Sequence, residues 1–189
     1  YAKAVPLVVV GRRVEGPGVL SLEFDNRTGA LLATQHLIEC GHTRIAFIAG
    51  DTAHQDAIDR ETGYRDALEA ENVAAIGRPE LSEGFEVVLE SRLPFTAIFA
   101  ANDQAAIGAA LGLYRKNVRV PDDVSLVGFD DLAPAKYAIP PLTTVRQSVY
   151  EMGCQAAIAM LDVLRGTPTS VNLPSPQLVP RESTRRVIR

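Results

Sequence analysis

The 189-residue sequence lacks the features that mark several classes of protein. It has no Trp, two Cys and three His, and their spacing indicates neither a disulfide framework nor a metal site. No segment approaches the roughly 20 consecutive apolar residues of a membrane-spanning helix. We therefore expect no metal and no membrane partner, with Cys40 and Cys154 as buried, reduced thiols within helices.

The chain also has fewer basic residues, 19, than acidic residues, 23. The net charge of −4 and the pI near 5.4 do not suit a chain that grips nucleic acid by itself. The first residues contain a short apolar run without a small-residue cleavage site, so we expect no signal peptide and a cytoplasmic location. The turn GRRVEGPG (11–18) lacks the strand-GxGxxG-helix order of a dinucleotide site, so we expect no cofactor.

Short apolar runs alternate with helical patterns along the whole chain. This alternation predicts an α/β fold with a parallel, doubly wound sheet. The expected strands lie at 7–10, 20–24, 45–49, 96–101, 125–129, 143–147 and 177–180.

A paired carboxylate follows one of these strands. Asp130 and Asp131 come directly after SLVGF (125–129), and in open α/β sheets ligands bind outside the carboxyl ends of the strands. An aspartate there either accepts hydrogen bonds from a ligand or caps a short helix that starts near Leu132. Position favours the ligand role for Asp130 and the cap for Asp131.

Other polar residues share this position relative to the strands. Asn102 follows the strand at 96–101, where its side chain suits a sugar hydroxyl but also the N-cap of the next helix, and capping is its expected main task. Arg60 opens a helix, where a positive charge opposes the helix dipole. It is either a ligand-binding fork or a solvated surface arginine.

Several longer motifs resemble one known family. The segments are PLVVVGRR (6–13), FDNRTGALLATQHLIECGHTRIAFIAG (24–50), RETGYRDALEAEN (60–72), TAIFAANDQAAIGAALGLYRKN (96–117), VPDDVSLVGFDD (120–131), IPPLTTVRQ (139–147) and LVPREST (178–184). In this order they are similar to the lactose-repressor-like (LacI/GalR) family of bacterial transcription regulators. The resemblance covers nearly the whole chain, apart from 73–95.

This resemblance implies a periplasmic-binding-protein-like fold of two Rossmann-like lobes with parallel sheets. The first lobe would comprise 1–42 and 148–177, and the second 43–147 and 178–189. Family members begin with a helix-turn-helix module, a hinge and further units of the first lobe, none of which precedes Tyr1. We therefore expect an incomplete first lobe, and contact with operator DNA only through an N-terminal module absent from this chain.

The resemblance also implies the site residues. Arg60 matches the arginine of the family's R-x-x-G-[FY] motif, Asp130 the first aspartate of G-[FY]-D-D, and Asn102 an effector contact in AANDQ. His54 and Asp56 fall in the loop that lines the pocket. The family's aromatic wall would correspond to 76–84, which has no aromatic residue.

The implied function is the effector-binding and dimerisation region of a LacI-type regulator. It would form a homodimer and sense a sugar or a similar small polar metabolite. A periplasmic sugar-binding protein of a transporter is the alternative, because it shares the two-lobe fold. An α/β enzyme is disfavoured, because the sequence has no nucleophile elbow, metal cluster or histidine paired with an acid.

Overall fold

The computed structural model describes residues 5–73 and 95–187, so the aromatic-free stretch 76–84 lies outside the described residues. The chain divides into two compact units, each built from two segments. The first unit comprises Tyr1–Asp25 and Gln147–Pro176, and the second comprises Asn26–Arg146 and Gln177–Arg189. No described helix has the length and apolar character needed to cross a membrane.

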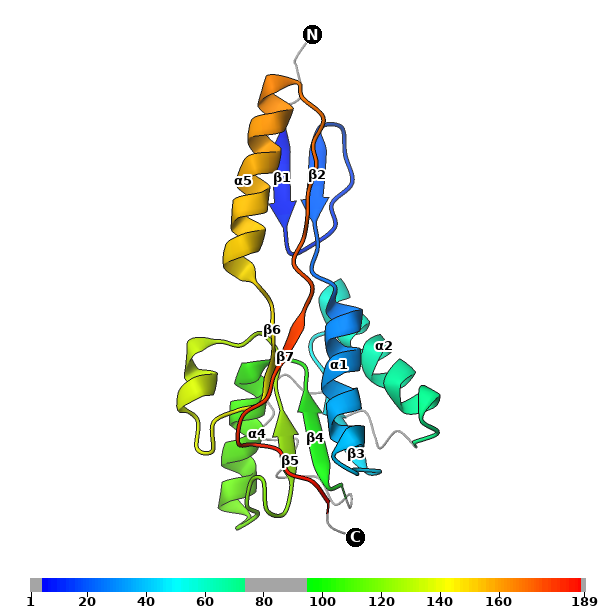
Figure 1. Ribbon diagram of the computed structural model, residues 1–189, viewed down its shortest axis with the longest axis vertical. Coiled ribbons are helices and arrows are strands. Elements are labelled where there is room, and N and C mark those ends of the chain that lie inside the picture. The colour runs from blue at the N-terminus through cyan, green and yellow to red at the C-terminus, as the bar shows by residue number, and fades with distance from the viewer. Residues whose placement is uncertain (1–4, 74–94, 188–189) are drawn as a thin grey trace. The chain divides into compact units, whose positions relative to one another are not determined.

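The first unit is a parallel strand pair with one helix (Figure 1). Strands β1 (Leu7–Val10) and β2 (Val19–Leu22) pair in parallel, and α5 (Val149–Arg165) lies against β1. The helix ends at Gly166, whose left-handed φ of 69° lets its N–H reach the carbonyl of Val163. Cys154 on α5 is exposed, so its expected burial is wrong, and Cys40 is half-buried.

The second unit contains the larger sheet. Strands β3 (Ile45–Ile48), β4 (Ala97–Ala100) and β5 (Ser125–Val127) run parallel in the order β3-β4-β5. Every residue of these strands is buried, as expected for a parallel sheet that is covered on both faces. Each of the seven expected strands has a counterpart in the structure, and their ends differ by at most two residues from those expected.

Helices cover the two faces of this sheet (Figure 1). Helices α1 (Asn26–Glu39) and α2 (Gln55–Ala70) place Ala30, Leu37 and Tyr64 against one face, which carries Phe47 and Phe99. Helix α4 (Asp103–Arg115) packs its small residues and Leu113 against the other face. Consecutive strand residues point to opposite faces of the sheet, so each short apolar strand contributes side chains to the hydrophobic cores on both faces.

One pair of strands breaks the expected parallel order. Strands β6 (Thr144–Arg146) and β7 (Gln177–Val179) are antiparallel, and Arg146 is opposite Gln177. The expected parallel arrangement holds for β1 with β2 and for β3, β4 and β5, but not for this pair. The physical reason is connectivity, because β6 is the last element before the chain leaves the second unit and β7 is the first after it returns.

Helix α1 belongs to the second unit. The first segment of the first unit ends at Asp25, directly before this helix. Its buried residues Ala30, Ala33 and Leu37 share a core with Phe47 and Tyr64, and this packing joins α1 to the unit of β3 and α2.

Candidate ligand-binding site

The backbone after β5 turns sharply and presents Asp130. Asp130 and Asp131 have φ values of 110° and 57°, which non-glycine residues seldom adopt, although Asp and Asn do so more readily than most. The Asp130 N–H donates to the Val145 carbonyl at 2.8 Å, and Asp130 forms a parallel bridge with Arg146. The loop of Asp130 therefore continues the sheet alongside β6.

Arg60 lies buried beside this loop. It belongs to the second turn of α2, its side chain is 10% exposed, and its guanidinium carbon lies 4.1 Å from the centre of the Phe129 ring. Its Nε donates to Asn26 Oδ1 at 2.9 Å, and its Nη1 donates to the Ala101 carbonyl at 2.5 Å. The hypothesis of a solvated surface arginine is therefore wrong.

The remaining guanidinium nitrogen of Arg60 faces two carboxylates. Nη2 lies 3.5 Å from Asp130 Oδ1 and 3.6 Å from Asp56 Oδ2, both longer than typical charge-assisted hydrogen bonds. Asp56 lies one turn before Arg60 on α2, so the helix itself brings these two side chains together. We call Arg60, Asp56 and Asp130 the Arg60 cluster.

The electrostatics of the Arg60 cluster bring the pKa of Asp130 close to the physiological range. Burial raises the pKa of Asp130 to about 6, Arg60 opposes this change, and the negative charges of Asp103 and Asp56 add to it. Burial also lowers the pKa of Arg60, although the three aspartates counteract that effect. A carboxyl that titrates near 6 accepts hydrogen bonds when ionised and donates one when protonated.

Asn102 caps α4, as expected. Its Oδ1 accepts a hydrogen bond from the Ala105 N–H at 2.7 Å, and its backbone is extended, as N-cap residues usually are. The preceding residue, Ala101, gives its carbonyl to Arg60. The residues that follow β4 thus cap α4 through Asn102 and bind Arg60 through the Ala101 carbonyl.

His54 lies apart from these contacts. It precedes α2, its side chain is 66% exposed, and its Nε2 lies 4.0 Å from Asp51 Oδ2. Within the described residues no hydrogen bond or ion pair joins His54 to the Arg60 cluster. The structure therefore brings Arg60, Asp56 and Asp130 together. Asn102 directly follows Ala101, whose carbonyl binds Arg60. His54 faces solvent.

Sequence reasoning missed the residues that hold Arg60. Asn26, at the start of α1, gave no local signal, because it meets Arg60 only when α1 packs on α2. Phe129 was recognisable only as part of a buried strand. Asp103 is fully buried and accepts hydrogen bonds from the Thr144 hydroxyl at 2.5 Å and the Leu132 N–H at 2.7 Å.

Asp131 does not cap a helix, contrary to expectation. The short 3-10 helix η1 (Ala133–Tyr137) has Leu132 at its N-cap, without a side-chain cap. The carboxylate of Asp131 instead pairs with Arg146 and Arg181. These two arginines are distant in sequence, so only the folded chain could reveal the pairing.

Comparison with known proteins places this geometry in a family. A model of the periplasmic binding protein-like domain matches residues 34–184, so the chain belongs to the periplasmic binding protein-like domain family, in the form found in LacI-type regulators. The HTH-type transcriptional regulator GalR of Escherichia coli (strain K12) is 39% identical over 189 residues, which cover 94% of this chain and 55% of GalR. The chain thus spans about half the length of the curated relatives it matches.

Solved structures agree with this assignment. A transcriptional regulator CelR-cellobiose complex superposes with a TM-score of 0.83 at 35% identity, covering 95% of this chain and 59% of that one. A lac repressor dimer bound to operator and an anti-inducer superposes with a TM-score of 0.85 at 28% identity, covering 96% of this chain and 66% of that one. The fold is therefore the periplasmic-binding-protein-like fold of LacI-family effector domains.

Proposed function

We propose that this chain is the effector-binding and dimerisation region of a LacI-type transcription regulator. It binds a sugar or a similar small polar metabolite and thereby controls the binding of operator DNA. The observation that carries the proposal is the Arg60 cluster, in which a buried guanidinium faces two carboxylates at the carboxyl ends of parallel strands. The relatives are transcription regulators, which favours this function over that of a transporter's binding protein or an enzyme.

The Arg60 cluster suits a neutral, hydroxyl-rich ligand. A guanidinium nitrogen donates to a hydroxyl oxygen, and the carboxylates of Asp130 and Asp56 accept from hydroxyl hydrogens. Two carboxylates beside one guanidinium leave an excess of negative charge, and buried Asp103 adds to it. This excess disfavours sugar acids and sugar phosphates, so we propose a neutral sugar as the effector, in line with the cellobiose named for a structural relative.

Regulation requires that the effector bind one arrangement of the protein better than another. The net charge of −4 disfavours direct contact of this chain with operator DNA, so a separate DNA-binding module would make that contact. A cytoplasmic location is part of the proposal, because a regulator must share a compartment with its operator.

The test of the site uses Asp130→Asn, since Asn tolerates the positive φ of this position. Calorimetric titration with cellobiose and a panel of neutral mono- and disaccharides should identify a ligand for the wild-type chain. The variant should bind that ligand roughly a hundredfold more weakly, because it loses a charged acceptor in a buried site. Equal affinity of the two proteins would remove Asp130 from the site.

The same variant should become more stable at neutral pH. A carboxyl whose pKa is raised to about 6 gains protons on folding, so its contribution to stability is lost as pH rises from about 4 through 6. The stability advantage of Asp130→Asn should therefore be smallest below about pH 4 and larger at pH 7.5, where it should be on the order of 2 kcal/mol in urea unfolding. If Asp130→Asn were no more stable than the wild type at pH 7.5, burial of the ionised Asp130 carboxylate would not cost stability.

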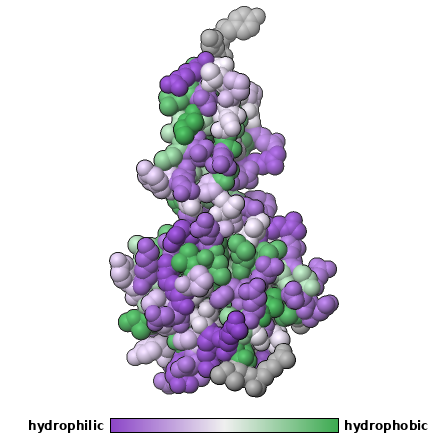
Figure 2. Space-filling view, viewed as in Figure 1, coloured by the Kyte–Doolittle hydropathy of each residue, from purple (hydrophilic) through white to green (hydrophobic). Residues whose placement is uncertain are grey.

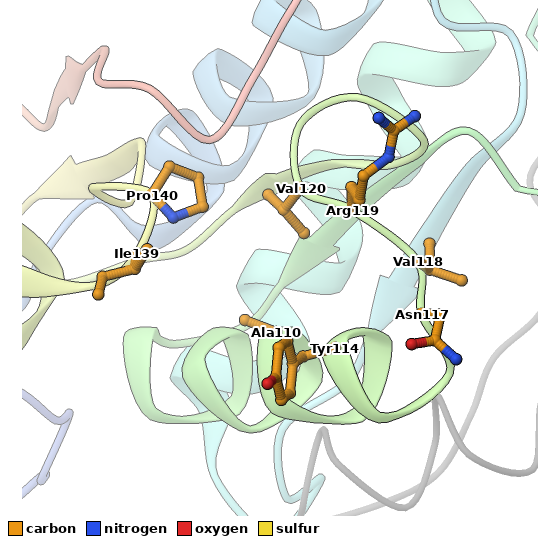
Figure 3. A pocket seen from close by; sticks show the side chains of 8 residues that line it. All are labelled: Ala110, Tyr114, Asn117, Val118, Arg119, Val120, Ile139 and Pro140. Atoms are coloured by element: carbon orange, nitrogen blue, oxygen red, sulfur yellow. The ribbon is translucent and has the colours of Figure 1, made fainter.

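Apolar side chains also gather on the outer side of α4. Ile107, Leu111 and Tyr114 are exposed there, and Ile139 in the loop after η1 is 96% exposed. Together they border a groove of about 380 Å³. Figure 3 shows an adjoining pocket, lined by Ala110 and Tyr114 of α4, by the segment of Val118 and Val120 that follows this helix, and by Ile139 and Pro140. We name this surface the α4 face.

We propose that the α4 face is covered by a second copy of the chain. Contiguous apolar surface of this kind marks interaction sites, and the lac repressor neighbour is described as a dimer. Figure 2 shows hydrophobic side chains exposed among hydrophilic ones on the visible face of the molecule.

Tyr114→Lys should turn the dimer into a monomer at micromolar concentration in sedimentation equilibrium, because two copies would bury like charges. Tyr150→Lys on α5 is the matched control, since Tyr150 is similarly exposed. Dissociation by the control alone would place the interface on α5 instead.

A further inference from the structure

The loop that presents Asp130 holds two unfavourable backbone conformations in succession. Positive φ at two adjacent non-glycine residues costs roughly 1–3 kcal/mol each and persists only where the surroundings enforce it. The bond from the Asp130 N–H to Val145 supplies one constraint. The bond from the Leu132 N–H to Asp103 supplies another, on the far side of the loop. Asp131, between them, is held by its side chain.

The Asp131 carboxylate is clamped by two arginines. Its Oδ2 accepts from Arg146 Nε at 2.7 Å, and its Oδ1 accepts from Arg181 Nη2 at 2.5 Å, so each oxygen has its own arginine. The Asp131 side chain is only 4% exposed. Burial alone would raise the pKa of Asp131, but the hydrogen bonds from Arg181 and Arg146 outweigh it and lower that pKa. The carboxylate is therefore ionised at neutral pH.

The two arginines lie at the ends of the chain's connections. Arg146 is the last residue of β6 and of the first segment of the second unit. Arg181 follows β7 by two residues, and it is fixed by further bonds from its Nη1 to the Leu142 carbonyl and from its N–H to the Thr143 hydroxyl. One carboxylate therefore joins the Asp130 loop to both segments through which the chain leaves and re-enters the second unit.

We propose that Asp131 is a positioning residue, which holds Asp130 beside Arg60 and couples its position to the ends of β6 and β7 through Arg146 and Arg181. The proposal rests on the proposed function for the role of Asp130 as a ligand contact. Through these contacts, binding of the effector at Asp130 would affect the segments that connect the two units. Any shift of the Asp130 backbone on ligand binding must move the Asp131 carboxylate, and with it both arginines.

A surface ion pair provides the contrast. Arg119 and Asp123 also form a two-point contact, at 3.0 Å, but both side chains are more than two-fifths exposed and the pair closes only its own turn. Asp123→Asn makes the same change of charge and size as Asp131→Asn. It is therefore the matched control for effects of charge alone.

The first experiment measures amide hydrogen exchange in this chain by NMR and needs no ligand. Asp131→Asn should accelerate exchange of the Asp130 and Leu132 amides by roughly tenfold or more, while amides of β4 keep their wild-type rates. Arg146→Gln, at a more exposed position, should give a smaller acceleration at the same amides, and Arg146→Lys should restore part of the protection. Unchanged exchange at Asp130, or equal acceleration in β4, would overturn the positioning role.

The second experiment measures affinity for a sugar that binds the wild-type chain in calorimetry. Asp131→Asn should weaken binding by about tenfold although residue 131 does not face Arg60, whereas Asp123→Asn should leave it unchanged. Equal affinity of wild type and Asp131→Asn, with exchange accelerated at Asp130, would overturn the coupling. If exchange changes as expected but none of the panel of sugars binds the wild type, the proposed function fails while the positioning of Asp130 by Asp131 stands.

Discussion

Replacing Arg60 with Met should abolish ligand binding and lower the free energy of unfolding by about 3–5 kcal/mol at pH 7, because negative charge that is already in excess around Asp130 loses its compensating cation. The substitution leaves the carboxylates of Asp130 and Asp56 without their shared positive charge. It also leaves the Asn26 side chain and the Ala101 carbonyl without their donor. Met keeps much of the side-chain volume over Phe129, so the loss reports charge and hydrogen bonding more than packing.

The pH dependence identifies the cause of this loss. Without Arg60, the pKa of Asp130 should rise further above 6, because Arg60 is the group that lowers it. The destabilisation measured in urea should therefore shrink as the pH falls from 7 to 5 and Asp130 becomes protonated. Arg65→Met is the matched control on the same helix, because Arg65 pairs with Glu61 at a half-exposed position, and it should cost less than about 1 kcal/mol. A loss that is equal at both pH values would assign Arg60 a packing role.

Gly63→Ala should destabilise the second unit by about 3 kcal/mol or more, as severe overpacking does. A Cβ at residue 63 would overlap the backbone carbonyl oxygen of Arg27 and lie 3.0 Å from the Cβ of Ala30. The Arg27 carbonyl belongs to the backbone of α1, so only a separation of α1 from α2 would relieve the clash. That separation would draw Asn26 away from Arg60 and weaken ligand binding as well.

Gly153→Ala is the control for this prediction. Gly153 also lies inside a helix, α5, but within the described residues an added Cβ there meets no atom within 4 Å. Ala has the higher helix propensity, so this variant should gain up to about 1 kcal/mol in thermal or urea unfolding. If Gly63→Ala were instead as stable as Gly153→Ala, helix propensity rather than the close approach of α1 would govern residue 63.

The contacts of the motif Arg60-x-x-Gly63-Tyr64 give each of its three residues a separate physical role. Arg60 carries the charge of the site, and Gly63 lets α1 approach closely enough for Asn26 to reach Arg60. Tyr64 stacks on Phe47 with ring centres 5.0 Å apart, and its hydroxyl donates to the Ile45 carbonyl at 2.7 Å. One turn of α2 thus combines the buried charge of the proposed ligand site, helix packing and attachment to the sheet.

The sequence by itself determined the strands, the two-faced burial of β3, β4 and β5, and the set of polar residues that follow them. These features depend on consecutive residues, because the alternation of side chains along a strand and the preference for an N-cap such as Asn102 act over a few positions. The family motifs then selected Arg60, Asp56 and Asp130, which the structure brings together.

Only the tertiary structure decided which groups complete the site and hold it. The partner of Arg60 at Asn26 is 34 residues away, and those of Asp131 at Arg146 and Arg181 are 15 and 50 residues away. The antiparallel pairing of β6 with β7 and the place of α1 in the second unit are likewise long-range results. Such contacts depend on how helices and strands pack. The residues that flank an arginine or aspartate in the sequence do not show whether its side chain faces solvent or a buried charge.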